Sequence, residues 1–463
     1  MSFQTWAIGA IVLLFLVIYH YIIFPSFISP LSNIPNAHFT APFLPTWMWW
    51  KRRTGFETRS VFAAHQRYGP IVRLAPDELS VASLDGLRQI YTGGYERHPW
   101  YFEEFANFGK ANLVSMQQHK PHSEQKRMIS HVYSKSYLQN SEDLKTLSHV
   151  LLFDRFLPLL DSAVQSDTPV EVLEFFQAVN MDFTSAYLLG VTNFTDFMRD
   201  VNARKHYIRM YRTKLLRLPG ADVATKYIES QCLSMCNAAE EFSMTPEKIL
   251  TSTPMTNPVV YNQLSSQISR LSSTDSSKSN TVLVASEILD HLLAGRETSA
   301  ITLIYLMHEL SRRPALQSAL RSELLTLSPP VLYSSNRTVL PHPQAVDGLP
   351  LLNAILYETL RLHAANPSPQ PRITPPGGAT IEGYADIPAG VRISTAAYCL
   401  HRNTEVFPDP DAWKPERWLQ GDQKKGGGTE EMRRWFWAFG SGGRMCIGSN
   451  LALQGTFLFE YQV

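Results

Sequence analysis

Residues 439–448 read FGSGGRMCIG, and this stretch says more about the 463-residue chain than any other part of it. It places Cys446 inside a glycine-rich loop, with Arg444 two residues before it and Gly448 two residues after it. A thiolate can ligate a metal, and glycines let the backbone approach the sulfur and turn N–H groups toward it. The arginine supplies a positive charge for an anionic part of the same ligand. The loop therefore predicts the axial thiolate of a haem iron, and the alternative for a single cysteine is a buried structural thiol.

The spacing Phe-x-x-Gly-x-Arg-x-Cys-x-Gly resembles the haem-binding loop of the cytochrome P450 superfamily. The resemblance implies that Cys446 holds the iron and that Arg444 binds a haem propionate. It also implies that Phe439 packs against the macrocycle and screens the thiolate, while Gly442 and Gly448 belong to the same cofactor-binding loop. The fold that it implies is mainly α with a minor β part.

A second segment of the same family lies in a long apolar helix pattern over residues 282–313, which Pro314 ends. It reads Ala294-Gly295-Arg296-Glu297-Thr298 and resembles the oxygen-activation segment. The resemblance implies that Ala294 and Gly295 leave room beside the iron for dioxygen. Thr298 and Glu297 are expected to deliver protons. The alternative for these five residues alone is a solvated turn or a small-residue contact between packed helices.

Two further segments predict a buried charge network. Glu358 and Arg361 stand three residues apart on a predicted helix over residues 351–363, so they share one helix face. Arg417, in the sequence Pro-Glu-Arg-Trp, matches the second arginine-bearing segment of the superfamily. The resemblance implies that the three side chains form a structural network behind the cysteine loop.

The resemblance also assigns cationic partners to the two haem propionates. Arg372 matches the basic position that follows the Glu-x-x-Arg helix. His122 and Arg127, on a predicted helix near residue 122, are the candidates for the other propionate. The alternative for that basic helix is a solvated face, because charged side chains are usually exposed.

Composition supports one large, mainly helical domain with a minor β part. The 42 Lys and Arg side chains nearly balance the 41 Asp and Glu side chains, so the net charge of +1 gives no indication of nucleic-acid binding. Four cysteines are too few for a disulfide scaffold. Short strands are expected near residues 71–82 and between residues 371 and 394.

The N-terminal region predicts a membrane anchor. The first fifty residues contain no Asp, Glu, Lys or Arg, and residues 6–24 are almost entirely apolar over a length that can cross a bilayer as a helix. A cleaved signal peptide would need a positive start and small residues at a cleavage site. We therefore expect a single-pass anchor over residues 1–25, a proline-rich connector over 26–50 and a catalytic domain over 51–463. Positive residues 51–53 favour a cytosolic domain on the endoplasmic reticulum.

Taken together, the resemblance implies a membrane-anchored haem-thiolate monooxygenase that inserts one oxygen atom of O2 into a small lipophilic substrate. Electrons would come from an NADPH-dependent flavoprotein reductase, because the chain has no dinucleotide fingerprint of its own. As a whole, the sequence resembles fungal members of the superfamily that modify secondary metabolites. The sequence ends seventeen residues after Cys446, so the C-terminal strands of the superfamily are expected to be missing. The alternatives are a haem-thiolate isomerase or dehydratase, and an inactive haem-binding protein.

Overall fold

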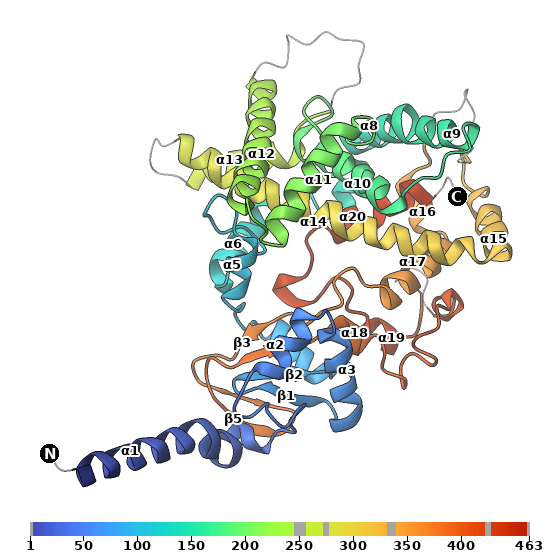
Figure 1. The fold of residues 1–463 in the computed structure, drawn as a ribbon. Coiled ribbons are helices and arrows are strands. Elements are labelled where there is room, and N and C mark those ends of the chain that lie inside the picture. The colour runs from blue at the N-terminus through green and yellow to red at the C-terminus, as the bar shows by residue number, and fades with distance from the viewer. Residues whose placement is uncertain (1–2, 245–255, 272–276, 331–338, 422–426, 461–463) are drawn as a thin grey trace.

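The computed structural model describes residues 3–244, 256–271, 277–330, 339–421 and 427–460. Figure 1 shows a large helical part, a smaller part that carries the strands, and an N-terminal helix that projects away from both. This arrangement agrees with the mainly α fold with a minor β part that the sequence predicts.

The helical segments up to residue 244 are α1 (Phe3–Ile18), η1 (Tyr19–Ile28), η2 (Pro30–Asn33), α2 (Thr46–Arg53), α3 (Glu57–Tyr68), α4 (Leu84–Leu87), η3 (Arg88–Thr92), α5 (Trp100–Phe105), α6 (His119–Ile129), α7 (Lys135–Asn140), α8 (Glu142–Leu151), η4 (Leu152–Phe156), α9 (Leu157–Gln165), α10 (Val172–Leu189), α11 (Val201–Leu215) and α12 (Ala221–Met244). Those that follow are α13 (Val259–Leu271), α14 (Ser277–Ser311), α15 (Pro314–Leu324), α16 (Pro343–Asp347), α17 (Pro350–Leu362), α18 (Ala397–Leu400), η6 (Pro415–Trp418), α19 (Glu430–Trp435), η8 (Gly442–Arg444) and α20 (Ser449–Glu460). Proline occupies the first turn of α15, α16 and α17, where no backbone N–H is needed.

The strands come from the two regions that the sequence predicts. Strands β1 (Ile71–Ala75) and β2 (Glu78–Val81) pair antiparallel, and β2 pairs in parallel with β6 (Arg392–Ser394), which also pairs with β3 (Arg372–Ile373). The sheet order is therefore β1-β2-β6-β3, so segments about 300 residues apart lie side by side. Strands β4 (Ala379–Ile381) and β5 (Tyr384–Ile387) form a separate hairpin.

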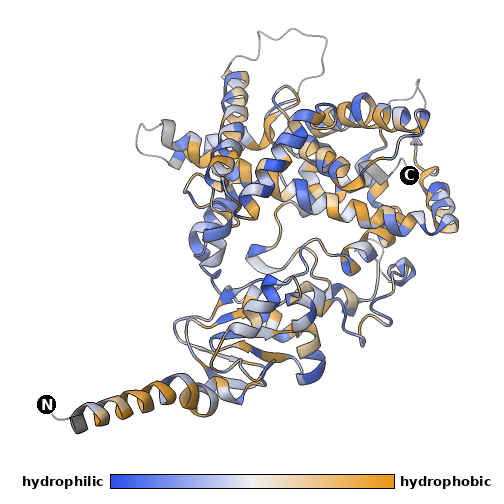
Figure 2. Ribbon diagram, viewed as in Figure 1, coloured by the Kyte–Doolittle hydropathy of each residue, from blue (hydrophilic) through white to orange (hydrophobic). Residues whose placement is uncertain are grey.

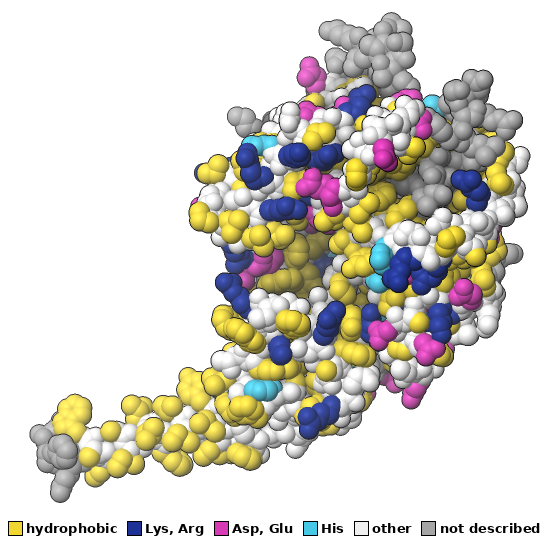
Figure 3. Space-filling model, turned by 45° about the vertical axis from the view of Figure 1, so that its right-hand side comes forward, with side chains coloured by type: hydrophobic (Ala, Val, Ile, Leu, Met, Phe, Trp, Pro, Cys, Tyr) yellow, Lys and Arg dark blue, Asp and Glu magenta, His cyan; other side chains and the backbone are white. Residues whose placement is uncertain are grey.

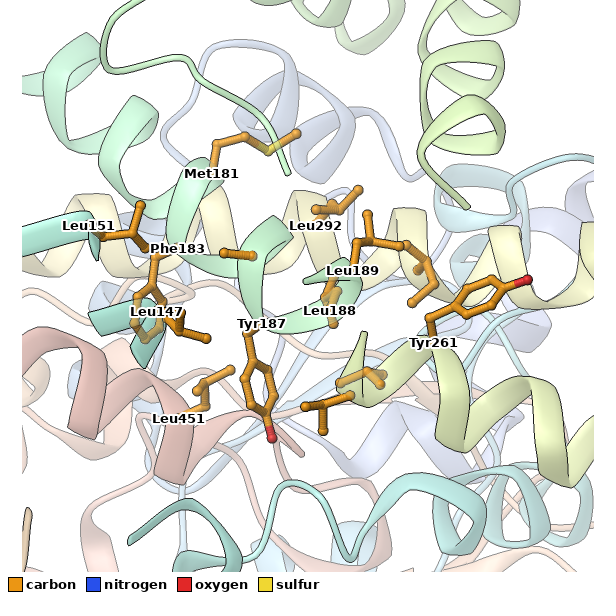
Figure 4. Packing of buried hydrophobic residues seen from close by; sticks show 14 of the residues in the cluster. Leu147, Leu151, Met181, Phe183, Tyr187, Leu188, Leu189, Tyr261, Leu292 and Leu451 are labelled. Atoms are coloured by element: carbon orange, nitrogen blue, oxygen red, sulfur yellow. The ribbon is translucent and has the colours of Figure 1, made fainter. Parts of the chain in front are cut away.

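The largest buried cluster surrounds α14, which crosses the middle of the domain in Figure 1. Its partners include α8, α10, α12 and α13, and Figure 4 shows side chains of α10, among them Tyr187, Leu188 and Leu189, in one cluster with Leu292 of α14. The contact between α10 and α14 is close at Gly295, where an added Cβ would lie 2.5 Å from the hydroxyl oxygen of Thr184. Removal of this much apolar surface from water is the main stabilising contribution to the helical part.

The N-terminal helix has the properties of a membrane span. Residues Trp6–Ile28 form a stretch of 23 residues with a mean hydropathy of 2.5, and none of it is buried against the domain. Figure 2 shows the predominantly hydrophobic colouring of α1. The residues expected to form a connector, 26–50, differ from that expectation. Leu31, Ile34 and Met48 are buried and pack against the part that carries the sheet, because apolar side chains between the prolines find partners there.

Candidate functional site

The cysteine loop is held by backbone contacts that require glycine. The N–H of Cys446 donates to the carbonyl of Phe439 at 2.9 Å, and residues Gly442–Arg444 form the short turn η8. Gly442 has a φ of +67°, and an added Cβ would lie 2.3 Å from the carbonyl oxygen of Tyr91. Gly448 has open space around its Cβ position, so close packing does not require a glycine there.

Cys446 is exposed, although the three other cysteines are buried. Desolvation by the surrounding protein raises the pKa of its thiol, while the N–H of Gly448 and the charge of Lys126 act in the opposite direction. A sulfur that is accessible and yet poorly hydrated lies in a recess of the protein. Figure 3 shows one face of the molecule that is hollowed between the helical part and the part that carries the sheet, with hydrophobic side chains inside the hollow.

Three arginines gather beside the loop. Arg97 and Arg372 are neighbours through a backbone bridge, and both are buried. Burial and the charges of Arg97 and Arg372 lower the pKa of Arg444 to about 9. Burial likewise lowers the pKa of Arg97 to about 10, and its Nε has no hydrogen-bond partner. The cluster thus holds an excess of positive charge that an anionic ligand would stabilise.

Backbone carbonyls accept the hydrogen bonds of these guanidinium groups. Arg444 donates to the carbonyls of Met116, Gln117 and Gln118 at 2.5, 2.7 and 2.9 Å. Arg97 donates to the carbonyls of Leu113 and Val114. Arg372 donates to the carbonyl of Pro371 at 3.0 Å and lies over the ring of Tyr91. The charges of Asp290 and Glu96 offset part of the charge of Arg97 and of Arg444, respectively, and the remaining positive charge is available to a ligand.

Helix α6 contributes to the site through side chains that differ in part from those expected. His122 is buried, and burial together with the charge of Arg444 lowers its pKa strongly, so it is a neutral donor or acceptor. Arg127 does not reach the site: it is exposed and donates to Ser123 at 3.3 Å, because it lies on the solvent side of the helix. Lys126 instead contacts the cysteine loop, donating to the carbonyls of Gly443 and Met445 at 3.0 and 2.8 Å.

The segment Ala294–Thr298 lies on α14, and two of its side chains are exposed in the middle of the domain. These are Ala294 and Thr298, and the Thr298 hydroxyl donates to the carbonyl of Ala294 at 2.8 Å. Asp290, one turn earlier on the same face, is close enough to Cys446 for its charge to raise the pKa of the thiol. The accessible face of α14 and the accessible sulfur therefore belong to one region.

Two residues of the segment have contacts that the sequence did not predict. Gly295 faces Thr184 of α10, so the missing side chain serves the contact between the helices rather than space for dioxygen. Glu297 forms an ion pair with Arg296 at 2.8 Å and accepts from Gln177 at 2.9 Å. In this structure the Glu297 carboxylate is therefore bound by Gln177 of α10 and by the adjacent Arg296.

Glu358, Arg361 and Arg417 lie together. Arg361 makes two hydrogen bonds of 2.8 Å to the carboxylate of Glu358, and the Nε of Arg417 lies 3.1 Å from the same group. The Nη1 of Arg361 also donates to the carbonyl of His401 at 2.9 Å. The Nε2 of His401 accepts from the N–H of Trp437 at 2.8 Å, and the indole N–H of Trp437 donates to Ser441 inside the cysteine loop. The network is thereby connected to the loop through hydrogen bonds.

The residues present fit a haem group. In the described ranges no three His, Cys, Asp or Glu side chains converge as a metal site, so a metal on Cys446 needs most of its ligands from a bound group. The buried arginine cluster, with the orphaned Nε of Arg97, suits the two propionates. A separate surface pocket of about 570 Å³ at the C-terminal ends of α14 and α17 includes none of the predicted site residues.

Sequence reasoning did not single out Arg97 and Lys126. No local sequence pattern could indicate that Arg97 lies beside Arg372, because the bridge between them joins residues 275 positions apart. Lys126 is adjacent to the predicted Arg127, and helix periodicity alone gave no reason to prefer one of them.

Comparisons with known proteins show the family and the fold of the chain. A family model described as Cytochrome P450 matches residues 38–462. The chain is 29% identical over 420 residues to cytochrome P450 monooxygenase avaI of Aspergillus versicolor, covering 87% of this chain and 96% of that protein. It is 26% identical over 452 residues to cytochrome P450 monooxygenase orf2 of Aspergillus niger, covering 93% and 85%. The crystal structure of the cytochrome P450DA heme domain has the same fold, with a TM-score of 0.65 at 15% identity over 88% of this chain and 86% of that one.

Proposed function

Because the chain belongs to the cytochrome P450 family and is a haem-thiolate monooxygenase, we propose that it inserts one oxygen atom of O2 into a lipophilic secondary metabolite. The observation that carries the proposal is the accessible thiol of Cys446 beside a buried cluster of arginines. A thiolate ligand to haem favours cleavage of the O–O bond. The fungal proteins to which the chain is similar are named as cytochrome P450 monooxygenases, which supports oxygen insertion.

Each side chain of the site has a role in this proposal. Cys446 ligates the iron, and Phe439 covers the ligand on the loop side. The propionates are held by the cations Arg444, Arg372 and Arg97, and neutral His122 can donate a hydrogen bond to one of them, while the exposed Arg127 has no part in this assignment. The hydrogen bonds from Lys126 to the carbonyls of Gly443 and Met445 keep the cysteine loop in place. When bound, the haem supplies the binding and activation of O2.

Proton delivery is assigned to α14. Thr298 is exposed on α14, and its hydroxyl can hold a water molecule in position. Glu297 can supply protons to that position only after its carboxylate leaves Arg296 and Gln177. Side-chain rotation of Glu297 is therefore part of the proposal.

Electrons for the reaction come from a redox partner, as in other monooxygenases of the family. We assign this part to an NADPH-dependent flavoprotein reductase. The apolar helix Trp6–Ile28 is proposed to anchor the protein in the endoplasmic reticulum, with residues 51–463 as the catalytic domain in the cytosol.

The spectrum of the reduced, CO-bound protein tests the proposal. The wild type should show the Soret band that is specific for thiolate ligation, and Cys446→Ala should lose it. Cys399→Ala is the matched control, because Cys399 is a buried cysteine of α18 that lies outside the loop. Retention of the band in Cys446→Ala would mean that another group holds the iron.

Turnover then separates oxygen insertion from an isomerase or dehydratase reaction. With reductase, NADPH and isotopically labelled O2, the product should carry one labelled oxygen atom. A product formed equally well without reductase, and without label, would contradict the assignment as oxygen insertion.

A further inference from the structure

Glu287 on α14 is a buried carboxylate outside the expected oxygen-activation segment. It has no exposed surface, and both of its oxygens lie 3.1 Å from the backbone N–H of Leu113. Its Oε2 also accepts from the side chain of Gln125 on α6 at 2.8 Å. One side chain thus joins α14 to α6 and to the segment that precedes it.

The segment that Glu287 holds is the one that orients two arginines of the haem site. Its carbonyls at Leu113 and Val114 accept from Arg97, and those of residues 116–118 accept from Arg444. The segment runs directly from Leu113 into α6, so its position depends on contacts at its start. Asn112 and Ser115 add local hydrogen bonds. A second carboxylate of α14, that of Asp290, accepts from the backbone N–H of Val114, so Glu287 holds the start of the segment and Asp290 the next residue.

We propose that Glu287 is a positioning residue for the cationic side of the haem site, because it fixes residues 112–118 on α14 and thereby directs Arg97 and Arg444 toward the propionates. The proposal rests on the haem site described above. It assigns to Glu287 no contact with the iron, the oxygen or the substrate.

The surroundings of Glu287 support this role. The unpartnered Nε2 of buried His291 lies 3.7 Å from its Oε1, and the other ring nitrogen of His291 lies 2.7 Å from the hydroxyl of Tyr133. Burial raises the pKa of Glu287 to about 8 and lowers that of His291 to about 4. Near neutral pH the Glu287 carboxyl group is therefore largely protonated, and it still accepts from the N–H of Leu113. Glutamine has the same donor and acceptor pattern, whereas leucine has neither.

The experiment compares Glu287→Gln and Glu287→Leu with a matched carboxylate. Glu323 also accepts from two backbone N–H groups, those of Leu351 and Leu352 at 2.8 and 2.9 Å, but it joins α15 to the start of α17. For each holoprotein we would measure the rate of haem loss to an excess of a haem-scavenging protein, the reduction potential by spectroelectrochemistry, and the urea midpoint.

We expect Glu287→Leu to weaken haem binding by about 10–100-fold, the range typical of residues that orient ligands of a metal site, and to shift the reduction potential. Glu287→Gln should retain most of the haem affinity and a reduction potential close to that of the wild type. Glu323→Leu should lower the urea midpoint without changing the rate of haem loss or the reduction potential. Equal haem retention and potential in Glu287→Leu and Glu323→Leu would overturn the proposal.

If Glu287→Leu does not fold, Gln125→Leu gives a second test, since it removes one of the contacts of Glu287. Gln125→Leu should also accelerate haem loss, but less than is expected for Glu287→Leu. If haem loss is not accelerated, the proposal is overturned. The thiolate band of the variants separates this outcome from a failure of the proposed function. That band depends on Cys446 and should persist in every variant that keeps haem.

Discussion

Replacement of Glu358 by glutamine should destabilise the protein strongly, because it leaves a buried cation without its counter-charge. Glu358 and Arg361 have no exposed side-chain surface. The carboxylate accepts from Arg361, Arg417, the indole N–H of Trp418 and the backbone N–H of Lys414. The amide of Glu358→Gln keeps the shape of the side chain, but it turns an NH2 group toward donors that need an acceptor.

The size of the effect follows from burial. Removal of one partner from a buried ion pair destabilises a protein by about 3–5 kcal/mol, since the remaining charge is left uncompensated. The matched control is Glu431→Gln, which breaks the pair of Glu431 with Arg434. That pair has the same three-residue spacing, but its side chains are 50% and 46% exposed. An exposed pair contributes only about 0–1 kcal/mol.

Urea unfolding of the holoproteins, followed by far-ultraviolet circular dichroism, measures the difference. Haem must be present at the same excess in all samples, because a ligand that binds only the native state adds to its apparent stability. Faster haem loss should accompany the destabilisation in Glu358→Gln, since hydrogen bonds connect Arg361 through His401 to the cysteine loop. If Glu358→Gln loses no more stability than Glu431→Gln, the argument from burial is refuted.

Three further predictions concern the backbone of the loop, pH and the anchor. Gly442→Ala should destabilise by about 1–3 kcal/mol more than Gly440→Ala in urea titrations, because both residues have a positive φ but only Gly442 meets a neighbouring carbonyl. Burial raises the pKa of Glu287 to about 8 and of Asp290 to about 7, so the folded state holds more protons than the unfolded chain between about pH 4 and 8. Stability should therefore fall as pH rises through this range, with a shallower fall of the urea midpoint in Asp290→Asn; an unchanged slope would contradict this. Deletion of residues 1–28 should move the protein from the membrane fraction to the supernatant with its thiolate band unchanged, and a deletion variant that still sediments with membranes would show a second attachment.

Most of the fold could be predicted from local patterns. The apolar run over 282–313 predicted a helix that the structure has at Ser277–Ser311, and the segment over 351–363 predicted the helix at Pro350–Leu362. Both are long periodic segments with proline at a boundary, which are the elements that local sequence describes best. The connector over residues 26–50 was less accurate, because prolines indicate irregular backbone but do not say whether the residues between them are buried.

The candidate site was predictable where one short segment carries the chemistry. Gly442 and Cys446 belong to such a segment, and their spacing alone indicates a thiolate loop. The direction of a side chain was harder to predict: Arg127 points to solvent, Lys126 contacts the loop, and Gly295 faces a neighbouring helix. These directions depend on how α6 and α14 are rotated against their partners, which is decided by packing.

By itself, the sequence determined the haem-thiolate class of the protein and an apolar N-terminal helix long enough to cross a membrane, since each depends on residues that are close together in the chain. Only the tertiary structure decided which cations surround the cysteine loop. The bridge between Arg97 and Arg372 and the hydrogen bonds from residues 116–118 to Arg444 join parts of the chain that are hundreds of residues apart. Such contacts form only when burial of the cores brings those segments together, because no local pattern can specify the orientation of two packed elements.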